Sequence, residues 1–71
     1  MSPRDVRGLL PPEPIEIILD AVDEGASGQR LSFVLPHFPG PLLPMLRDRG
    51  VRFDSEMLPD MSGVIFHVDI P

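Results

Sequence analysis

The chain has 71 residues, a formal net charge of −5, ten prolines and no cysteine. This length predicts one small domain, and a hydrophobic fraction of 42% is enough for a folded core. The missing cysteine excludes disulfides, thiolate catalysis, iron–sulfur ligation and persulfide chemistry on this chain. An acidic chain without a basic stripe argues against direct nucleic-acid binding. No apolar run is long enough to span a membrane and no signal peptide opens the chain, so we expect a cytoplasmic protein without a membrane partner.

The N-terminal third predicts a short strand and then a helix. The strand is expected over residues 3–6, with its last residue, Val6, pointing inward. The helix is expected over 12–24, because its apolar residues recur at the spacing of one helical face. That face carries Ile15, Ile18, Leu19 and Val22. Pro12 and Pro14 suit the first turn, where backbone N–H groups have no helical partners.

The middle third predicts a strand, a rigid loop and a second helix. Residues 30–35 alternate in the manner of a strand, with Leu31, Phe33 and Leu35 on one side. A proline-rich loop follows at 36–40. The helix is expected over 41–49, with Leu42, Met45 and Leu46 as its buried stripe. Pro44 can be tolerated only in its first turn, and Gly50 is expected to end it.

The C-terminal third predicts two strands, over 51–58 and 64–70, joined by a hairpin loop. In the first strand Val51, Phe53 and Met57 are expected to face inward. In the second strand the inward residues are Val64, Phe66, Val68 and Ile70. Met45 and Met57 are interpreted as core filler, because methionine fits irregular gaps.

The element order is therefore β-α-β-α-β-β. Right-handed crossovers put both helices on one face of the sheet. The last strand is the most apolar and should be central, which gives the order 1-2-4-3 with strand four antiparallel to its neighbours. The predicted fold class is α/β, as an α+β two-layer sandwich whose second sheet face stays open to water.

Two motifs at the first strand and helix resemble a known family. D-x-R-G-L at residues 5–9, followed by P-E-P at 12–14, is similar to the opening of the TusA/SirA-like sulfur-carrier family. The signature of that family is a strand followed by Cys-Pro-x-Pro at a helix start. The element order and the length are also similar, which implies the two-layer fold of the C-terminal domain of translation initiation factor three.

Pro11 stands where that family carries its persulfide cysteine. The whole chain more closely resembles a cysteine-less, uncharacterised branch of the family, which shares the loop H-x-P-x-P-L at 37–42 and R-G at 49–50. Such domains also occur fused to cupin-like or hemerythrin-like domains. The resemblance therefore implies a module that works beside other proteins, with a loose link to redox or metal enzymes.

The candidate binding surface is the corner where the first helix begins, together with the His37 loop. Turns after neighbouring parallel strands lie at the same sheet edge, where open α/β sheets bind ligands. Leu9, Leu10 and Phe38 are large apolar residues in loops, and clustered they would form a contact patch held rigid by prolines. The candidate residues are Arg7, Leu10, Pro11, Glu13, His37 and Phe38. Two alternatives stay open: these side chains cap the core, or the partner binds Val34 and Ile65 on the open sheet face.

Nothing in the sequence supplies a nucleophile with a base and an orienting group, so we expect no enzyme activity and no cofactor. Anion binding at the first helix start is disfavoured, because its prolines lack N–H groups and Glu13 repels anions. His37 and His67 lack a metal-ligand spacing, and His67 is expected beside Asp69.

Three function classes remain. The first is a non-catalytic adaptor that binds another protein. The second is an accessory protein in sulfur-transfer, redox or metalloenzyme pathways that acts only through a partner. The third is a small metal- or ligand-binding protein that uses His37. The expected oligomeric state is a monomer or a weak dimer.

Overall fold

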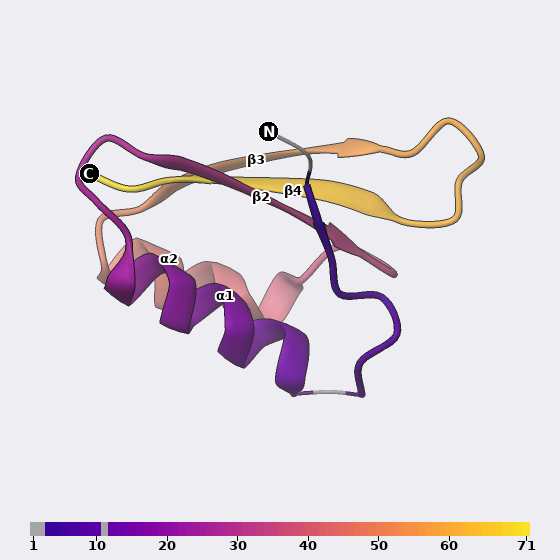
Figure 1. Cartoon of the computed structure of the whole chain (residues 1–71), viewed down its shortest axis with the longest axis horizontal. Helices are drawn as coiled ribbons and strands as arrows, with labels where there is room; N and C mark the ends of the chain where they lie inside the picture. Colours follow the sequence, from indigo (N-terminus) through magenta and orange to yellow (C-terminus); the bar gives the residue numbers. More distant parts are fainter. Residues whose placement is uncertain (1–2, 11) are drawn as a thin grey trace.

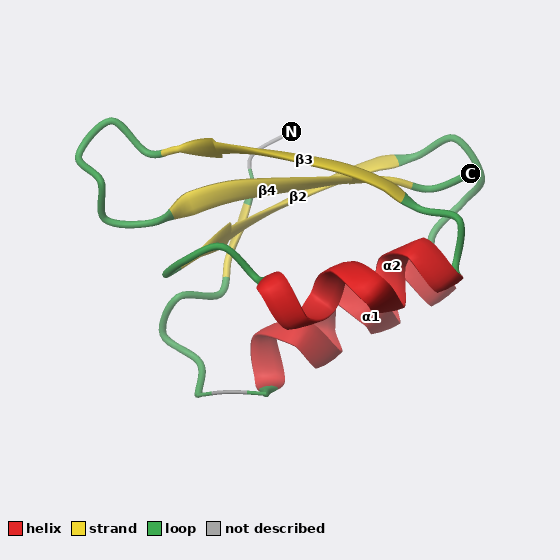
Figure 2. Ribbon diagram, turned by 180° about the vertical axis from the view of Figure 1, so that it is seen from behind, coloured by secondary structure: helices red, strands yellow, loops and turns green. Residues whose placement is uncertain are grey.

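The computed structural model describes residues 3–10 and 12–71. Both helices cover one face of a four-stranded sheet, and the other face is open (Figures 1 and 2). The elements are β1 (Arg4–Asp5), α1 (Glu13–Glu24), β2 (Arg30–Leu35), the 3-10 turn η1 (Gly40–Leu42), α2 (Leu43–Asp48), β3 (Arg52–Met57) and β4 (Val64–Asp69). The sheet order is β1-β2-β4-β3, with β1 parallel to β2 and β4 antiparallel to β2 and β3. The predicted order and fold class are therefore confirmed. No helix in the described part of the chain has the length and apolar character needed to cross a membrane.

The core lies between β4 and the two helices. Alternate residues of β4 and the residue after it are buried, as the pattern predicted: Val64, Phe66, Val68 and Ile70. Phe66 is completely buried, and Phe53 stacks on it with ring centroids 5.7 Å apart. From α1, Ile18 and Val22 are buried, which confirms the predicted apolar face of that helix.

The helix α2 is short and has well-defined ends. Pro44 lies in its first turn, where it removes no helical hydrogen bond. At the other end Gly50 has φ +69°, and its N–H donates to the carbonyl of Arg47 at 3.0 Å. The N–H of Val51 donates to the carbonyl of Leu46, also at 3.0 Å. This pair of bonds is a Schellman motif, which explains why the helix stops where glycine was expected.

Two methionines were wrongly predicted to fill the core. Met57 is 58% exposed and Met45 is 39% exposed. Met57 lies on the last position of β3, an edge strand, and α2 has only six residues to cover that edge. Alternation fixes the side of the sheet to which a residue points, but it does not show whether another element covers that side.

Candidate functional site

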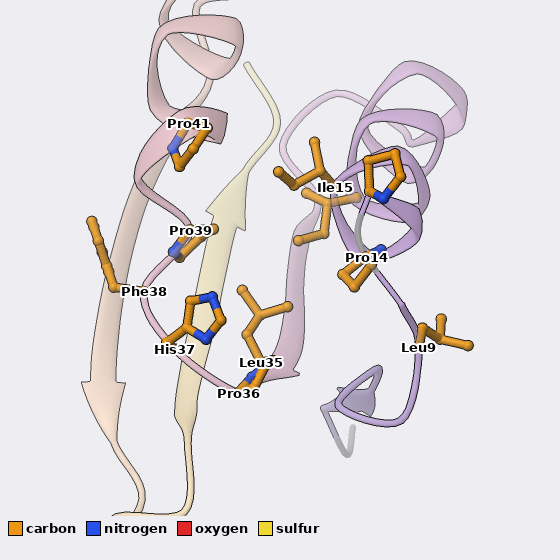
Figure 3. Close-up of a pocket in the computed structure, with 11 residues that line it drawn as sticks. Leu9, Pro14, Ile15, Leu35, Pro36, His37, Phe38, Pro39 and Pro41 are labelled. Atoms are coloured by element: carbon orange, nitrogen blue, oxygen red, sulfur yellow. The ribbon is translucent and has the colours of Figure 1, made fainter.

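A pocket lies where the sequence predicted a binding corner. The carboxyl ends of β1 and β2 lie at the same end of the sheet, since the two strands are parallel. Leu9, Pro12 and the first half of α1 form one wall, and the end of β2 with the loop after it forms the other (Figure 3). Between them is a cavity of about 320 Å³.

The lining of the pocket is almost entirely apolar. Five lining residues are prolines: Pro12, Pro14, Pro36, Pro39 and Pro41. Four are aliphatic: Leu9, Ile15, Ile18 and Leu35. Ile18 and Leu35 also belong to the buried core, so the pocket opens directly onto it. Phe38 and His37 complete the lining, and His37 is the lining residue with a polar side chain.

Both walls are held by local structure. On the first wall the N–H of Leu9 donates to the carbonyl of Val6 at 3.3 Å, and the N–H of Glu13 donates to the carbonyl of Leu10 at 2.9 Å. On the second wall the N–H of Leu42 donates to the carbonyl of Pro39 at 3.0 Å. Proline fixes φ and offers no N–H, so these walls are stiff and present few hydrogen-bond donors. The arrangement suits recognition of an apolar group.

The structure brings only part of the predicted site together. His37 and Phe38 line the pocket on the second wall, and Leu9 lines it on the first. The ring of Phe38 points away from α1 and meets Phe66 edge-on, with centroids 6.0 Å apart (Figure 3). Leu10 is 78% exposed and is not part of the lining. Pro11 lies outside the described residues.

Glu13 and Arg7 are also outside the pocket lining. Glu13 is exposed at the start of α1, where its charge favours the positive end of the helix dipole. Arg7 turns towards the hairpin loop instead, where its Nη1 donates to Ser62 Oγ at 2.9 Å. Arg7 also forms an ion pair with Asp5, with Nη2 and Oδ2 2.9 Å apart. The hydrogen bonds from the Arg7 side chain lower the pKa of Asp5 below its usual value. Arg7 thus ties the end of β1 to the loop before β4.

The open sheet face contains a polar chain that sequence reasoning did not find. Ser32 Oγ lies 2.7 Å from His67 Nδ1, and His67 Nε2 lies 3.3 Å from Glu56 Oε1. His67 shares the open face with Asp69, two residues further along β4, and the register places it directly opposite Ser32 and Asp54. Only the pairing of β2 with β4 could have revealed this contact.

The remaining candidates are separated in space. His37 lies at the pocket, whereas His67 lies on the opposite, open face of the sheet. Within residues 3–10 and 12–71, no group of three potential ligands could hold a metal ion. Val34 and Ile65, the rival apolar contact, are direct cross-strand partners and are half-buried.

A family model described as "Uncharacterized conserved protein (DUF2249)" matches residues 4–71. Comparisons with curated proteins and with solved structures found no match. The family match covers every described element, from β1 to β4. The chain therefore belongs to the DUF2249 family of uncharacterized conserved proteins.

Proposed function

We propose that this domain is a non-catalytic binding module that holds an apolar side chain of another protein in the pocket between α1 and the loop after β2. The observation that carries the proposal is the pocket itself. It has a volume of about 320 Å³, and it is lined by prolines and by residues of the hydrophobic core. Pockets that bind small groups have volumes of roughly 300–1,000 Å³. The pocket of this domain is therefore large enough for one bulky aromatic or aliphatic side chain.

The physical basis of binding is burial of apolar surface at low entropic cost. Removing apolar surface from water contributes roughly 25 cal/mol per Å². Stiff proline walls lose little freedom on binding, which leaves more of that energy as affinity. His37, as the polar side chain of the lining, supplies a hydrogen bond that orients the bound segment.

A second candidate function follows from the position of the pocket. It lies at the start of α1, the place where TusA/SirA-like carriers hold their cysteine. The observed sheet order and the P-P-E-P stretch at residues 11–14 support a relation to that family. On this proposal, a protein of sulfur transfer or of a redox pathway docks at this corner, and the chain acts only through that partner.

Selection from a phage-displayed library of random peptides tests the first proposal. The expected result is a set of peptides that share one large apolar residue. Leu9→Asp combined with Phe38→Asp should abolish their binding, because a carboxylate at the mouth is costly to desolvate. Val34→Asp combined with Ile65→Asp is the matched control on the open face and should bind normally. Circular dichroism checks that both variants fold.

Two outcomes would decide against these readings. If the Leu9→Asp, Phe38→Asp variant folds and still binds every selected peptide, the pocket is not the binding site. For the second candidate, the probe is a purified cysteine desulfurase. Failure of the immobilised wild-type domain to retain it, in a column where a cysteine-bearing carrier of this fold does, would contradict a role in sulfur transfer.

A further inference from the structure

The two edges of the sheet differ in length. β1 forms one edge with two residues, and β3 forms the other with six (Figure 1). In the described chain no strand pairs with the outer side of β3. A free edge of this length offers a row of unpaired N–H and C=O groups to another strand. Very short edge strands are one common protection against such pairing, and only the β1 edge has it.

Charges on β3 do not protect its edge in the usual way. Arg52, Asp54 and Glu56 alternate along the open face, so the strand begins with a positive charge and ends with a negative one. A parallel copy would place Arg52 against Arg52 of the other copy. An antiparallel copy places Arg52 against a carboxylate. In an antiparallel register centred on Asp54, Arg52 and Glu56 of the two copies are therefore complementary at both ends of the strand, and only the central Asp54 lies opposite a like charge.

The helix side of β3 is incompletely covered. Phe53 is only partly buried although its ring stacks on Phe66. Met57, two residues beyond Ser55 on the same side, is largely exposed. A strand added at this edge would cover both apolar side chains. The unpaired backbone, the charges at the ends of β3 and its apolar side chains thus all favour an antiparallel strand at this edge.

We propose that a second copy of this chain pairs with β3 along its free edge, in an antiparallel register centred on Asp54. In this register Arg52 of each copy lies opposite Glu56 of the other, and Phe53 lies opposite Ser55. The two sheets become one continuous sheet. The two Asp54 carboxylates approach each other at the centre. Each is already bound by Arg30 of its own copy, whose Nη2 lies 3.0 Å from each of the two carboxylate oxygens. This edge is separate from the pocket, and the inference does not rest on the proposed function.

Sedimentation equilibrium of the full chain, up to roughly millimolar concentration, tests the proposal. The wild type should be a reversible dimer. Arg52→Glu should raise its dissociation constant by about tenfold, because two attractive cross-strand pairs become repulsive. Arg52→Glu combined with Glu56→Arg should restore dimerisation. Arg4→Glu, the same charge change at the opposite edge, is the matched control and should leave the dimer unchanged.

Three results would overturn the inference. The first is a wild type that stays monomeric over the whole concentration range. The second is a dimer that Arg52→Glu weakens no more than Arg4→Glu does. The third is an Arg52→Glu, Glu56→Arg protein that folds, as judged by circular dichroism, and remains as weakly associated as the single variant. The phage-selected peptides report on the pocket independently, so their binding to Arg52→Glu should equal binding to wild type.

Discussion

Truncation of Phe66 to alanine is the sharpest test of the packing described here. Phe66 is fully buried at the centre of β4. Its ring stacks on Phe53 and meets Phe38 edge-on, so the side chain joins the edge strand β3 and the pocket loop to the core. The Phe66→Ala substitution removes these contacts together and leaves a cavity under both helices.

The expected loss of stability follows from these contacts. Replacing a buried phenylalanine by alanine costs about 3–5 kcal/mol. Two aromatic contacts, at about 0.5–1.5 kcal/mol each, place Phe66 in the upper part of that range. A domain has about 0.05–0.15 kcal/mol of stability per residue, which gives roughly 4–11 kcal/mol for 71 residues. The substitution should therefore remove a large share of the free energy of unfolding.

Urea denaturation followed by circular dichroism measures this loss directly. For a domain of this size each kcal/mol lowers the melting temperature by about 4–8 °C, so a drop of at least about 12 °C is expected. Phe38→Ala is the matched control, because the same group is removed from a side chain that is 45% exposed. It should cost about 1 kcal/mol. If Phe66→Ala melts within a few degrees of wild type, Phe66 is not at the centre of the core.

Three further predictions concern the loop, pH and the pocket. Gly63→Ala should lower stability by about 1–3 kcal/mol in urea denaturation, because a Cβ there would overlap the backbone carbonyl oxygen of Leu35. Hydrogen bonds from Arg49 lower the pKa of Asp23 in the folded state. The Arg49–Asp23 pair therefore stabilises the fold above the unfolded-state pKa of Asp23, and this contribution is lost as pH falls through the folded-state pKa of Asp23. The stability difference between wild type and Arg49→Gln should therefore shrink below about pH 4 in urea denaturation. His37→Ala should weaken binding of the selected peptides while leaving the urea midpoint unchanged, since this side chain is exposed; a shifted midpoint would instead assign His37 a structural role.

Much of the fold could be predicted because local signals and tertiary packing agree. The strand over residues 30–35 was predicted with the bounds that the structure has. The central position of β4 followed from its apolar alternation, and the end of α2 followed from Gly50, whose positive φ the structure confirms. In each case one short stretch of sequence contains the whole physical cause.

The details of the site depended on which other elements cover each residue and which residues lie opposite it on the neighbouring strands. Leu9 and Leu10 are adjacent leucines, yet only Leu9 lines the pocket, because the turn before α1 directs Leu10 into solvent. The contact between Ser32 and His67 requires the register of two strands separated by 35 positions in the chain. Composition and spacing do not encode such contacts, so the polar chain on the open face could not be predicted.

The position of β4 also has a consequence for synthesis. It is translated after both of its neighbours, yet it lies between them in the sheet and joins β2 to β3. Until residues 64–69 have left the ribosome, β3 has no strand to pair with in the described sheet, and the apolar side of β2 faces an unfinished core. The nascent chain therefore cannot fold progressively from its N-terminus and must assemble as a unit once β4 emerges. During that interval its unpaired strand edges and apolar surface are open to other chains and to chaperones.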